Sequence, residues 1–398
     1  MGPRRPPLSA NTAMDAQPLY DFTPIVRMAA LGVALALGPM AWVWLRHRGA
    51  TPAFRLRALT LLTLFLTFDL VVFGAFTRLS DSGLGCPDWP GCYGNASPLG
   101  AKAEIHAEQS LRPGGPVTHG KAWVEMVHRY LATAVGVLIT VMALASWFEA
   151  RRGRATISPW WATATLVWVC AQGAFGALTV TLKLYPAIVT LHLLGGIGLL
   201  ALLAVQGELA LPRPMVLDNG TRRLLLAVAA LVLLQVSLGG WVSTNYAVLA
   251  CSDFPTCQGA WWPEMDFRHG FTLLRDLGET RGGDFLPFAA LTAIHYTHRL
   301  MAYAVLAALL WLAWRLHRSA QAAPRSAAFA LVGIALWQLA SGLGNVVLGW
   351  PLVAALAHTA GAAVLVALLA VLMVRTAPAA LPEHDDSRQP SRPVRAML

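Results

Sequence analysis

The sequence predicts an all-α polytopic membrane protein with two tandem, pseudo-symmetric four-helix bundles and one extra N-terminal transmembrane helix. Composition, nine long apolar stretches and an internal repeat support this prediction. Of the 398 residues, 56% are hydrophobic and only 13% are charged, which is about half the charged fraction of an average soluble domain. A soluble protein of this length needs more charge on its surface, and a disordered chain would be less apolar.

The basic residues argue for a lipid bilayer as the partner and against nucleic acid. The formal net charge is +10, which in a soluble protein would suggest nucleic-acid binding only if the basic residues clustered on one face. Here they lie in short gaps between apolar stretches, where membrane topology places them.

Each of the nine apolar stretches is long enough to cross the hydrocarbon core, because a helix of about 20 residues spans about 30 Å. The first stretch does not read as a secretory signal peptide, because an Arg-rich turn follows it instead of a small-residue cleavage site. The predicted spans are 25–45, 57–77, 123–148, 160–181, 187–207, 222–243, 288–314, 326–349 and 352–374.

Arginine-rich gaps set the predicted orientation. By the positive-inside rule these gaps are cytoplasmic, and they alternate regularly with the remaining connections. Nine spans then place the N-terminus in the periplasm and the C-terminus in the cytoplasm. No Arg- and Ser-rich transit segment precedes the first span, which favours a bacterial inner membrane over an organelle. The Arg-rich segments are 46–57, 149–159, 208–223, 315–325 and the C-terminal tail.

The second through ninth spans contain the same unit twice. "VVFGAFTRLSDSGLGCPDWPGCYG" (71–94) resembles "VSLGGWVSTNYAVLACSDFPTCQG" (236–259), and two histidine motifs recur further along, with offsets of 165, 170 and 166 residues. Each unit has an even number of spans, so both enter the membrane from the same side as parallel repeats. The predicted segments are 1–56 (tail, extra helix and Arg-rich turn), 57–207 (first repeat), 208–221 (cytoplasmic linker), 222–374 (second repeat) and 375–398 (cytoplasmic tail).

Four histidines lie inside spans at repeated positions: His128, His192, His298 and His358. Each repeat carries two, on its second and fourth helices, at nearly equal depths of about 7–8 Å for the first pair. Two imidazoles on opposite sides of a flat macrocycle form a bis-His haem site. Single membrane histidines commonly bond between helices instead, and zinc or copper sites need three or more ligands.

Charged residues flank the first histidine of each pair. Arg129 and Arg299 directly follow His128 and His298, and could either bind a haem propionate or extend to the membrane interface. Glu125 lies three residues before His128 and therefore on the same helix face. It is a candidate acid or base, unless it is simply a solvated interfacial carboxylate.

The second repeat differs at the position of this acid. The residue equivalent to Glu125 is His295, a candidate to support the neighbouring histidine ligand. This asymmetry predicts one haem site for chemistry and one for electron storage.

Four of the five cysteines form two C-x5-C pairs, Cys86/Cys92 and Cys251/Cys257, in outer loops. The periplasm is oxidising, so each pair is expected to form a local disulfide, helped by the turn-forming proline between the cysteines. Zinc bound by four thiolates is the competing interpretation, but the spacing is wider than that of usual zinc sites. A structural and a redox role both remain open for Cys86–Cys92, whereas a structural role is favoured for Cys251–Cys257.

The motif "TRLSDSGLGCPDWPGCYG" (77–94), followed by "EMVHR" (125–129), "LHLLGG", "HYTHR" and a final membrane histidine, resembles the haem A synthase family. The resemblance covers 57–374 and implies an eight-helix pseudo-symmetric membrane core with paired-cysteine loops. It implies oxidation of the C8 methyl group of haem O to a formyl group by successive hydroxylation, giving haem A for terminal oxidases. The helix at 25–45 is a departure from the eight-helix core.

The resemblance also implies roles for the residues. The N-terminal half would take haem O as substrate, and the C-terminal half would hold a haem b cofactor through its iron. Expected partners are the enzyme that supplies haem O, the terminal oxidase assembly and an electron acceptor of unassigned identity. The implied residues are His128 and His192 (substrate haem), His298 and His358 (haem b), Glu125 (essential acid), and the pairs Cys86/Cys92 and Cys251/Cys257.

Two other classes of function compete with this oxidoreductase. A di-haem b membrane cytochrome that relays electrons without modifying haem predicts two permanent haems with similar spectra and needs no Glu125. A transporter built on tandem repeats predicts a substrate site between the halves, and it leaves the paired histidines unexplained.

Overall fold

The computed structural model describes residues 22–376, and the predicted tails 1–22 and 378–398 lie almost wholly outside this range. Within it, nine helices are long and apolar enough to cross a membrane, and each coincides with a predicted stretch. They are α1 (Thr23–Arg46), α2 (Pro52–Leu79), α4 (His119–Arg151), α5 (Pro159–Thr181), α6 (Pro186–Leu209), α7 (Asn219–Thr244), α9 (Phe288–His317), α10 (Ala322–Val347) and α11 (Leu352–Arg375).

Local sequence explains where several of these helices begin. The side chains of Thr51, Thr118 and Asp218 cap α2, α4 and α7 by accepting backbone N–H bonds. Such caps satisfy amides that have no partner inside the helix. Proline occupies the first position of α2, α5 and α6, where its missing N–H costs nothing. Three short helices in the loops were not predicted: α3 (Lys102–Leu111), η1 (Ala247–Leu249) and α8 (Phe267–Gly270).

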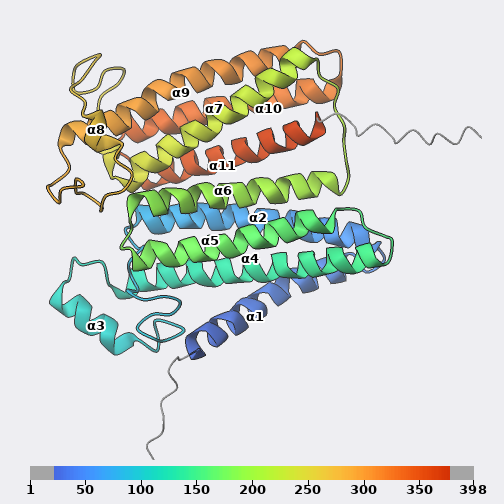
Figure 1. Cartoon of the computed structure of the whole chain (residues 1–398), viewed down its shortest axis with the longest axis horizontal. Helices are drawn as coiled ribbons and strands as arrows, with labels where there is room; N and C mark the ends of the chain where they lie inside the picture. Colours follow the sequence, from blue (N-terminus) through green and yellow to red (C-terminus); the bar gives the residue numbers. More distant parts are fainter. Residues whose placement is uncertain (1–21, 377–398) are drawn as a thin grey trace, which may run out of the picture.

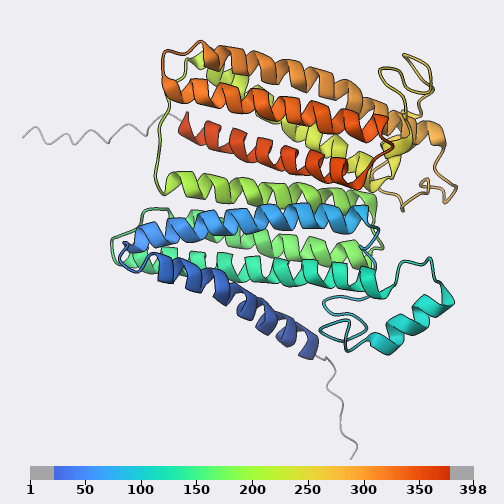
Figure 2. The same ribbon diagram turned by 180° about the vertical axis from the view of Figure 1, so that it is seen from behind.

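The long helices form two groups, α2–α6 without α3 and α7–α11 without α8, which lie side by side (Figures 1 and 2). In the first group α2 contacts α4, α4 contacts α5, α5 contacts α6 and α6 contacts α2. The second group repeats this ring with α7, α9, α10 and α11. Helices α4 and α6 are therefore diagonal to each other, as are α9 and α11. The large loops with α3 and α8 lie at one end, here called the loop end.

The two groups meet through equivalent surfaces. Helix α6 contacts its counterpart α11, and the contact of α2 with α11 is matched by that of α7 with α6. Equivalent residues also meet at the loop end. Tyr246 donates to Asp81 Oδ1 at 2.9 Å, and Arg78 donates to the carbonyl of Ser243 at 2.8 Å; both pairs are related by the repeat offset of 165. At the opposite end Arg375 of α11 donates to the buried Glu208 of α6 at 2.9 Å.

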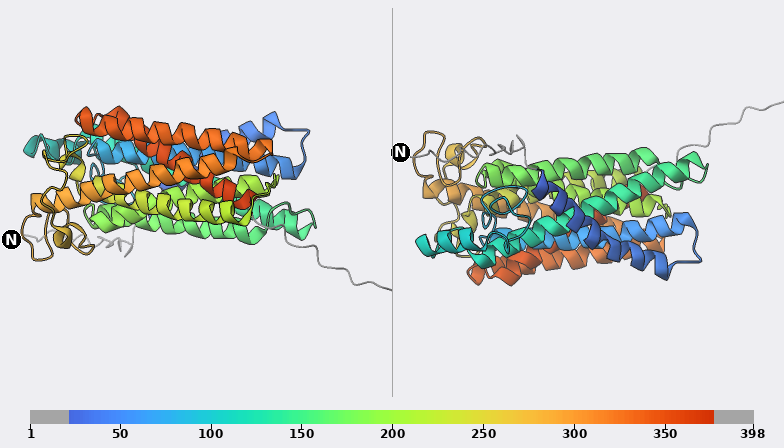
Figure 3. Two further views of the ribbon diagram at one scale, coloured as in Figure 1. Left: turned by 90° about the horizontal axis from the view of Figure 1, so that it is seen from above. Right: turned by 90° about the horizontal axis from the view of Figure 1, so that it is seen from below.

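Helix α1 has no counterpart in the second group and crosses obliquely over the outside of α4 (Figure 3). Its buried residues Met28, Gly32, Ala36 and Val43 lie along one face. Gly32 allows the close approach, since a Cβ there would lie 2.4 Å from the Thr133 methyl carbon. Met28 packs in a cluster that includes Cys86 and Cys92, so α1 supports the first cysteine loop.

The aliphatic cores begin at a fixed distance from the histidines. Val135 and Leu199 in the first half, and Val305 and Leu365 in the second, each follow a membrane histidine by seven residues, or two helical turns. From there the cores extend away from the loop end. The four histidines therefore lie between the aliphatic cores and the cysteine loops.

Candidate functional site: two histidine pairs beneath the cysteine loops

Each of the four histidines packs against a glycine on the neighbouring helix of its ring. A Cβ added to Gly74 of α2 would lie 3.0 Å from Cε1 of His128, and one on Gly239 of α7 would lie 3.0 Å from Cε1 of His298. The other two pairs follow the same rule: Gly176 of α5 faces His192 at 3.4 Å, and Gly342 of α10 faces His358 at 3.2 Å. The glycines admit the Cε1 edge of each imidazole between helices, so that the ring is held by packing.

The paired histidines of each half lie on diagonal helices that do not contact each other within the described residues. His128 and His298 occupy the third turn of α4 and α9, whereas His192 and His358 occupy the second turn of α6 and α11. The members of each pair are nevertheless near enough to interact electrostatically. The turn numbers differ within each pair because α4 and α9 extend further toward the loop end than α6 and α11 do.

The two pairs differ in their hydrogen bonds. In the second half, Gln235 Nε2 lies 3.1 Å from His298 Nδ1, and Ser341 Oγ lies 3.0 Å from His358 Nδ1. In the first half, the Nδ1 atoms of His128 and His192 are buried without a hydrogen-bond partner among the described residues. Sequence reasoning missed Gln235 and Ser341, although the repeat alignment shows that their counterparts are apolar.

This arrangement fits a haem in each half. Two imidazoles on diagonal helices can approach a flat macrocycle from opposite sides. Residues 22–376 contain no cluster of three or more His, Cys, Asp or Glu side chains able to hold a metal ion. A zinc or copper centre built from protein ligands alone is therefore not supported by the geometry.

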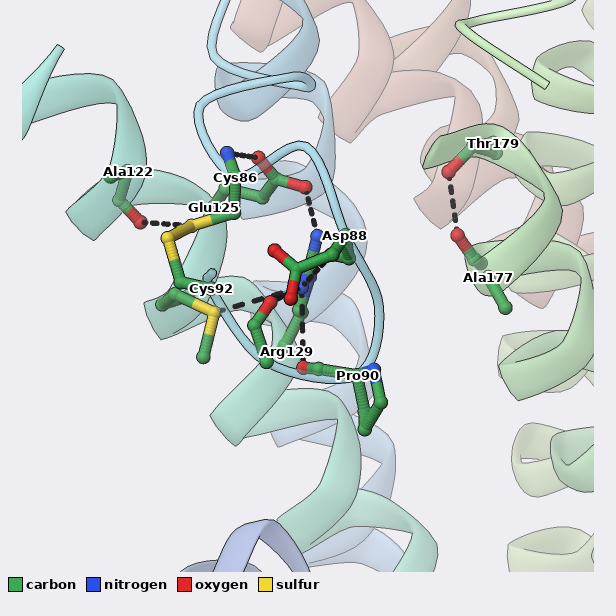
Figure 4. Close-up of polar contacts among 12 residues, drawn as sticks. Cys86, Asp88, Pro90, Cys92, Ala122, Glu125, Arg129, Ala177 and Thr179 are labelled. Carbon is green, nitrogen blue, oxygen red and sulfur yellow. Dashed lines mark hydrogen bonds and ion pairs between the residues drawn. A yellow bond between two sulfur atoms is a disulfide. The ribbon is translucent and has the colours of Figure 1, made fainter. Parts of the chain in front are cut away.

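Glu125 lies beneath the first cysteine loop and is only 4% exposed. Its Oε2 accepts the backbone N–H of Cys86 at 2.8 Å, and its Oε1 pairs with the Arg129 guanidinium. Figure 4 shows both side chains pointing from α4 into the loop. The carboxylate is not a solvated interfacial group; it is fixed in place one helical turn from His128.

Both predicted disulfides are present, Cys86–Cys92 and Cys251–Cys257, and the two loops share an internal design. Asp88 accepts the backbone N–H groups of Tyr93 and Gly94, and Asp253 accepts those of Gln258 and Gly259. The Thr256 hydroxyl and these amides hold the pKa of the partly buried Asp253 carboxyl at about 2. An ionised carboxylate thus closes the loop from inside.

Arg129 and Arg299 hold these loops onto the helices, a role that sequence reasoning did not anticipate. Arg129 donates to the carbonyl groups of Asp88 and Pro90 at 2.9 and 3.2 Å. Arg299 donates to those of Asp253, Thr256 and Cys251 at 2.9, 2.7 and 3.1 Å. Neither guanidinium extends freely into solvent, and contact with a haem propionate stays a prediction for both.

His295 takes the place of Glu125 in the second half, but with different bonds. Its Nδ1 lies 2.9 Å from the carbonyl of Ala247 in η1, and its Nε2 lies 3.5 Å from Arg299. The imidazole is 6% exposed. A neutral ring bridging a carbonyl and a guanidinium replaces the carboxylate of the first half, so the two halves differ in charge at this point.

Comparisons with known proteins agree with this site. The model of a family described as "Cytochrome oxidase assembly protein" (COX15-CtaA) matches residues 57–370, a range that leaves out α1. A haem A synthase from Shewanella oneidensis is 38% identical over 315 residues, covering 78% of this chain and 93% of the relative. Haem A synthases from Methylobacterium sp. (strain 4-46) and Caulobacter sp. (strain K31) are 30% and 29% identical, covering 81% and 76% of this chain and 92% and 90% of the relatives.

The family match includes both cysteine loops, Glu125 and all four membrane histidines. The matched range is most of the chain, and the alignments cover about nine-tenths of each relative's length. This chain therefore belongs to the COX15-CtaA family of haem A synthases.

Proposed function

We propose that this multi-pass membrane protein is an oxidoreductase that converts haem O to haem A by successive hydroxylation of the C8 methyl group to a formyl group. The observation that carries the proposal is the pair of histidine sites beneath chemically different residues: Glu125 with Arg129 in one half, and His295 with Arg299 in the other. One site then has a buried carboxylate for chemistry, and the other does not.

In the proposed assignment His128 and His192 bind the substrate haem O, and His298 and His358 bind haem b through its iron. Haem b would supply one-electron transfer. The chain's own residues orient the imidazoles through the four glycines, and they hold the Glu125 carboxylate against the Cys86 amide. Burial of Glu125 keeps bulk water away from this group, which strengthens its effect on a neighbouring charge.

The membrane setting follows the arginine pattern. The end opposite the loops carries Arg-rich connections, so we place it in the cytoplasm of a bacterial inner membrane, and the cysteine loops in the periplasm. An oxidising periplasm is compatible with both disulfides. Haem A formed here would be passed to terminal oxidase assembly, and a separate enzyme would supply haem O.

Glu125→Gln is the sharpest test of the chemical role. Glutamine retains an oxygen that can accept the Cys86 amide, but it removes the charge and the proton-transfer ability. We expect haem binding to persist while haem A formation falls at least about 100-fold, the lower bound for losing an acid or base. The measurement is chromatography of haem extracted from the purified variant. Glu104→Gln, on the exposed face of α3, is the matched control.

The ligand assignment has its own test. His298→Ala and His358→Ala should deplete haem b, whereas His128→Ala and His192→Ala should deplete haem O and haem A. Normal haem A output from Glu125→Gln would remove this carboxylate from the reaction. Two equivalents of haem B without haem O or haem A in the wild-type protein would instead support an electron relay.

A further inference from the structure

The second-half histidines are each held by a polar side chain from the next helix. Gln235 Nε2 lies 3.1 Å from His298 Nδ1 and also donates to the main-chain carbonyl of His298 at 3.1 Å. An amide nitrogen only donates, so this contact holds the His298 ring but does not place a proton on Nδ1. Ser341 Oγ donates to the Trp337 carbonyl at 2.7 Å, so its lone pairs are free to accept from Nδ1–H of His358 at 3.0 Å. A proton on Nδ1 leaves Nε2 of His358 with the lone pair that an iron ligand needs.

The first half has lost both groups while keeping the same backbone. The repeat offsets place Leu70 where the second half has Gln235, and Phe175 where it has Ser341. Neither side chain can form a hydrogen bond, and the Nδ1 atoms of His128 and His192 are buried without a partner among the described residues. The glycines facing all four imidazoles are retained. Among the residues packed against the four imidazoles, the halves therefore differ in the groups that contact Nδ1 and in Phe73, which stacks on His128 where the second half has Leu238.

A partner on the remote nitrogen fixes the tautomer and the orientation of a metal-binding histidine, and its loss typically costs 10–100-fold in affinity. We propose that Ser341 is a positioning residue that makes the second-half site retain its haem, and that Phe175 at the equivalent place makes the first-half site release its haem. This inference rests on the proposed function. It explains how two similar sites serve a cofactor that stays and a product that leaves.

The test measures haem release directly. Purified protein is mixed with excess apomyoglobin, and the transfer of haem b is followed by the change in the Soret band. Ser341→Ala should release haem b about 10-fold faster or more, up to about 100-fold. Ser237→Ala is the matched control, because Ser237 Oγ donates only to the Leu233 carbonyl of its own helix; its release rate should equal that of the wild type.

A second readout separates positioning from a general structural effect. The EPR g values of an oxidised low-spin haem depend on the relative orientation of its two imidazole planes, so they should change in Ser341→Ala and stay constant in Ser237→Ala. The reciprocal variant Phe175→Ser should slow release from the first half. This variant keeps the test decisive even if Ser341→Ala folds poorly.

The inference is overturned if haem b leaves Ser341→Ala at the wild-type rate and Phe175→Ser releases its haem as fast as the wild type. That outcome leaves the proposed function intact, provided that His298→Ala and His358→Ala still lack haem b. A wild-type protein that binds no haem at all would contradict the proposed function itself.

Discussion

Each of the four membrane histidines packs against a glycine on a neighbouring helix, and the missing side chain leaves room for the imidazole. The positions of the histidines could be predicted from the sequence, because their distance from the ends of the apolar stretches and their recurrence in both repeats can be read from it. Their glycine neighbours could not be picked out by spacing, since the chain has 34 glycines and the sequence does not say which face of α2 or α7 meets the next helix. A signal was available, however, because Gly74 and Gly239 share the repeat offset, as do Gly176 and Gly342.

Gly239→Ala should weaken haem binding in the second half alone. The new Cβ would lie 3.0 Å from Cε1 of His298, so the imidazole must shift by a few tenths of an ångström, at a cost of about 1–3 kcal/mol. We expect a clear loss of haem b from the purified variant, measured as its pyridine haemochrome. Gly333→Ala on α10 has open space around its Cβ and should keep the full haem content. Equal haem in both variants would contradict the role of the glycine.

At the scale of elements, the spans were predictable and the loops were not. A helix that crosses a bilayer is specified by its own length and apolarity, so all nine predicted stretches are confirmed as helices. The cysteine loops, in contrast, are shaped by contacts with distant residues. Arg299 lies more than 40 residues from the carbonyl groups that it binds, and no local pattern reveals that contact. Helices α3 and α8 were not predicted either, because each is too short to show the long apolar stretch that identifies a span.

Arg299→Lys should loosen the second cysteine loop without breaking its disulfide. Lysine lacks the planar fork that reaches three carbonyl groups at once, and hydrogen bonds to charged groups contribute about 1.5–3 kcal/mol each. Hydrogen-exchange mass spectrometry should show the amides of residues 251–260 exchanging at least about 10-fold faster than in the wild type. Arg281→Lys, at an exposed position in the same loop, serves as control. Unchanged exchange in Arg299→Lys would mean that the disulfide alone fixes the loop.

At the scale of the whole molecule, two similar halves meet through equivalent helices whose contacting residues differ. The duplication was evident from constant sequence offsets, but the surface that joins the halves was not, since apolar helices carry lipid-facing and protein-facing sides that look alike in composition. The structure places α6 against α11 and closes their ends with an ion pair. Glu208 is 3% exposed and binds Arg375 across the halves as well as Arg213 in the linker.

The contact of Glu208 with Arg375 is expected to stabilise the union of the two halves. Removing one partner of a buried ion pair costs about 3–5 kcal/mol when a charge is left uncompensated, and the cost here is smaller because Arg213 still pairs with Glu208 at 2.6 Å. Arg375→Gln should therefore lower the melting temperature in detergent, and the double variant with Glu208→Gln should lose less than the sum of the single changes. Arg213 is 59% exposed at its side chain, so Arg213→Gln should have a smaller effect. Strict additivity in the double-mutant cycle would indicate that Glu208 and Arg375 do not interact.

The meeting of Asp81 with Tyr246, and of Arg78 with Ser243, also determines which surfaces can recognise each other. In a symmetric dimer of identical units, positions near the two-fold axis face their own copies. Two first halves would bring Asp81 against Asp81, and the Arg78 of each copy would lie near the Asp81 of the other, because Arg78 here lies over the ring of Tyr246, the counterpart of Asp81. The Tyr246 hydroxyl therefore gives Asp81 a hydrogen-bond donor that a second copy of the first half would not present at this place.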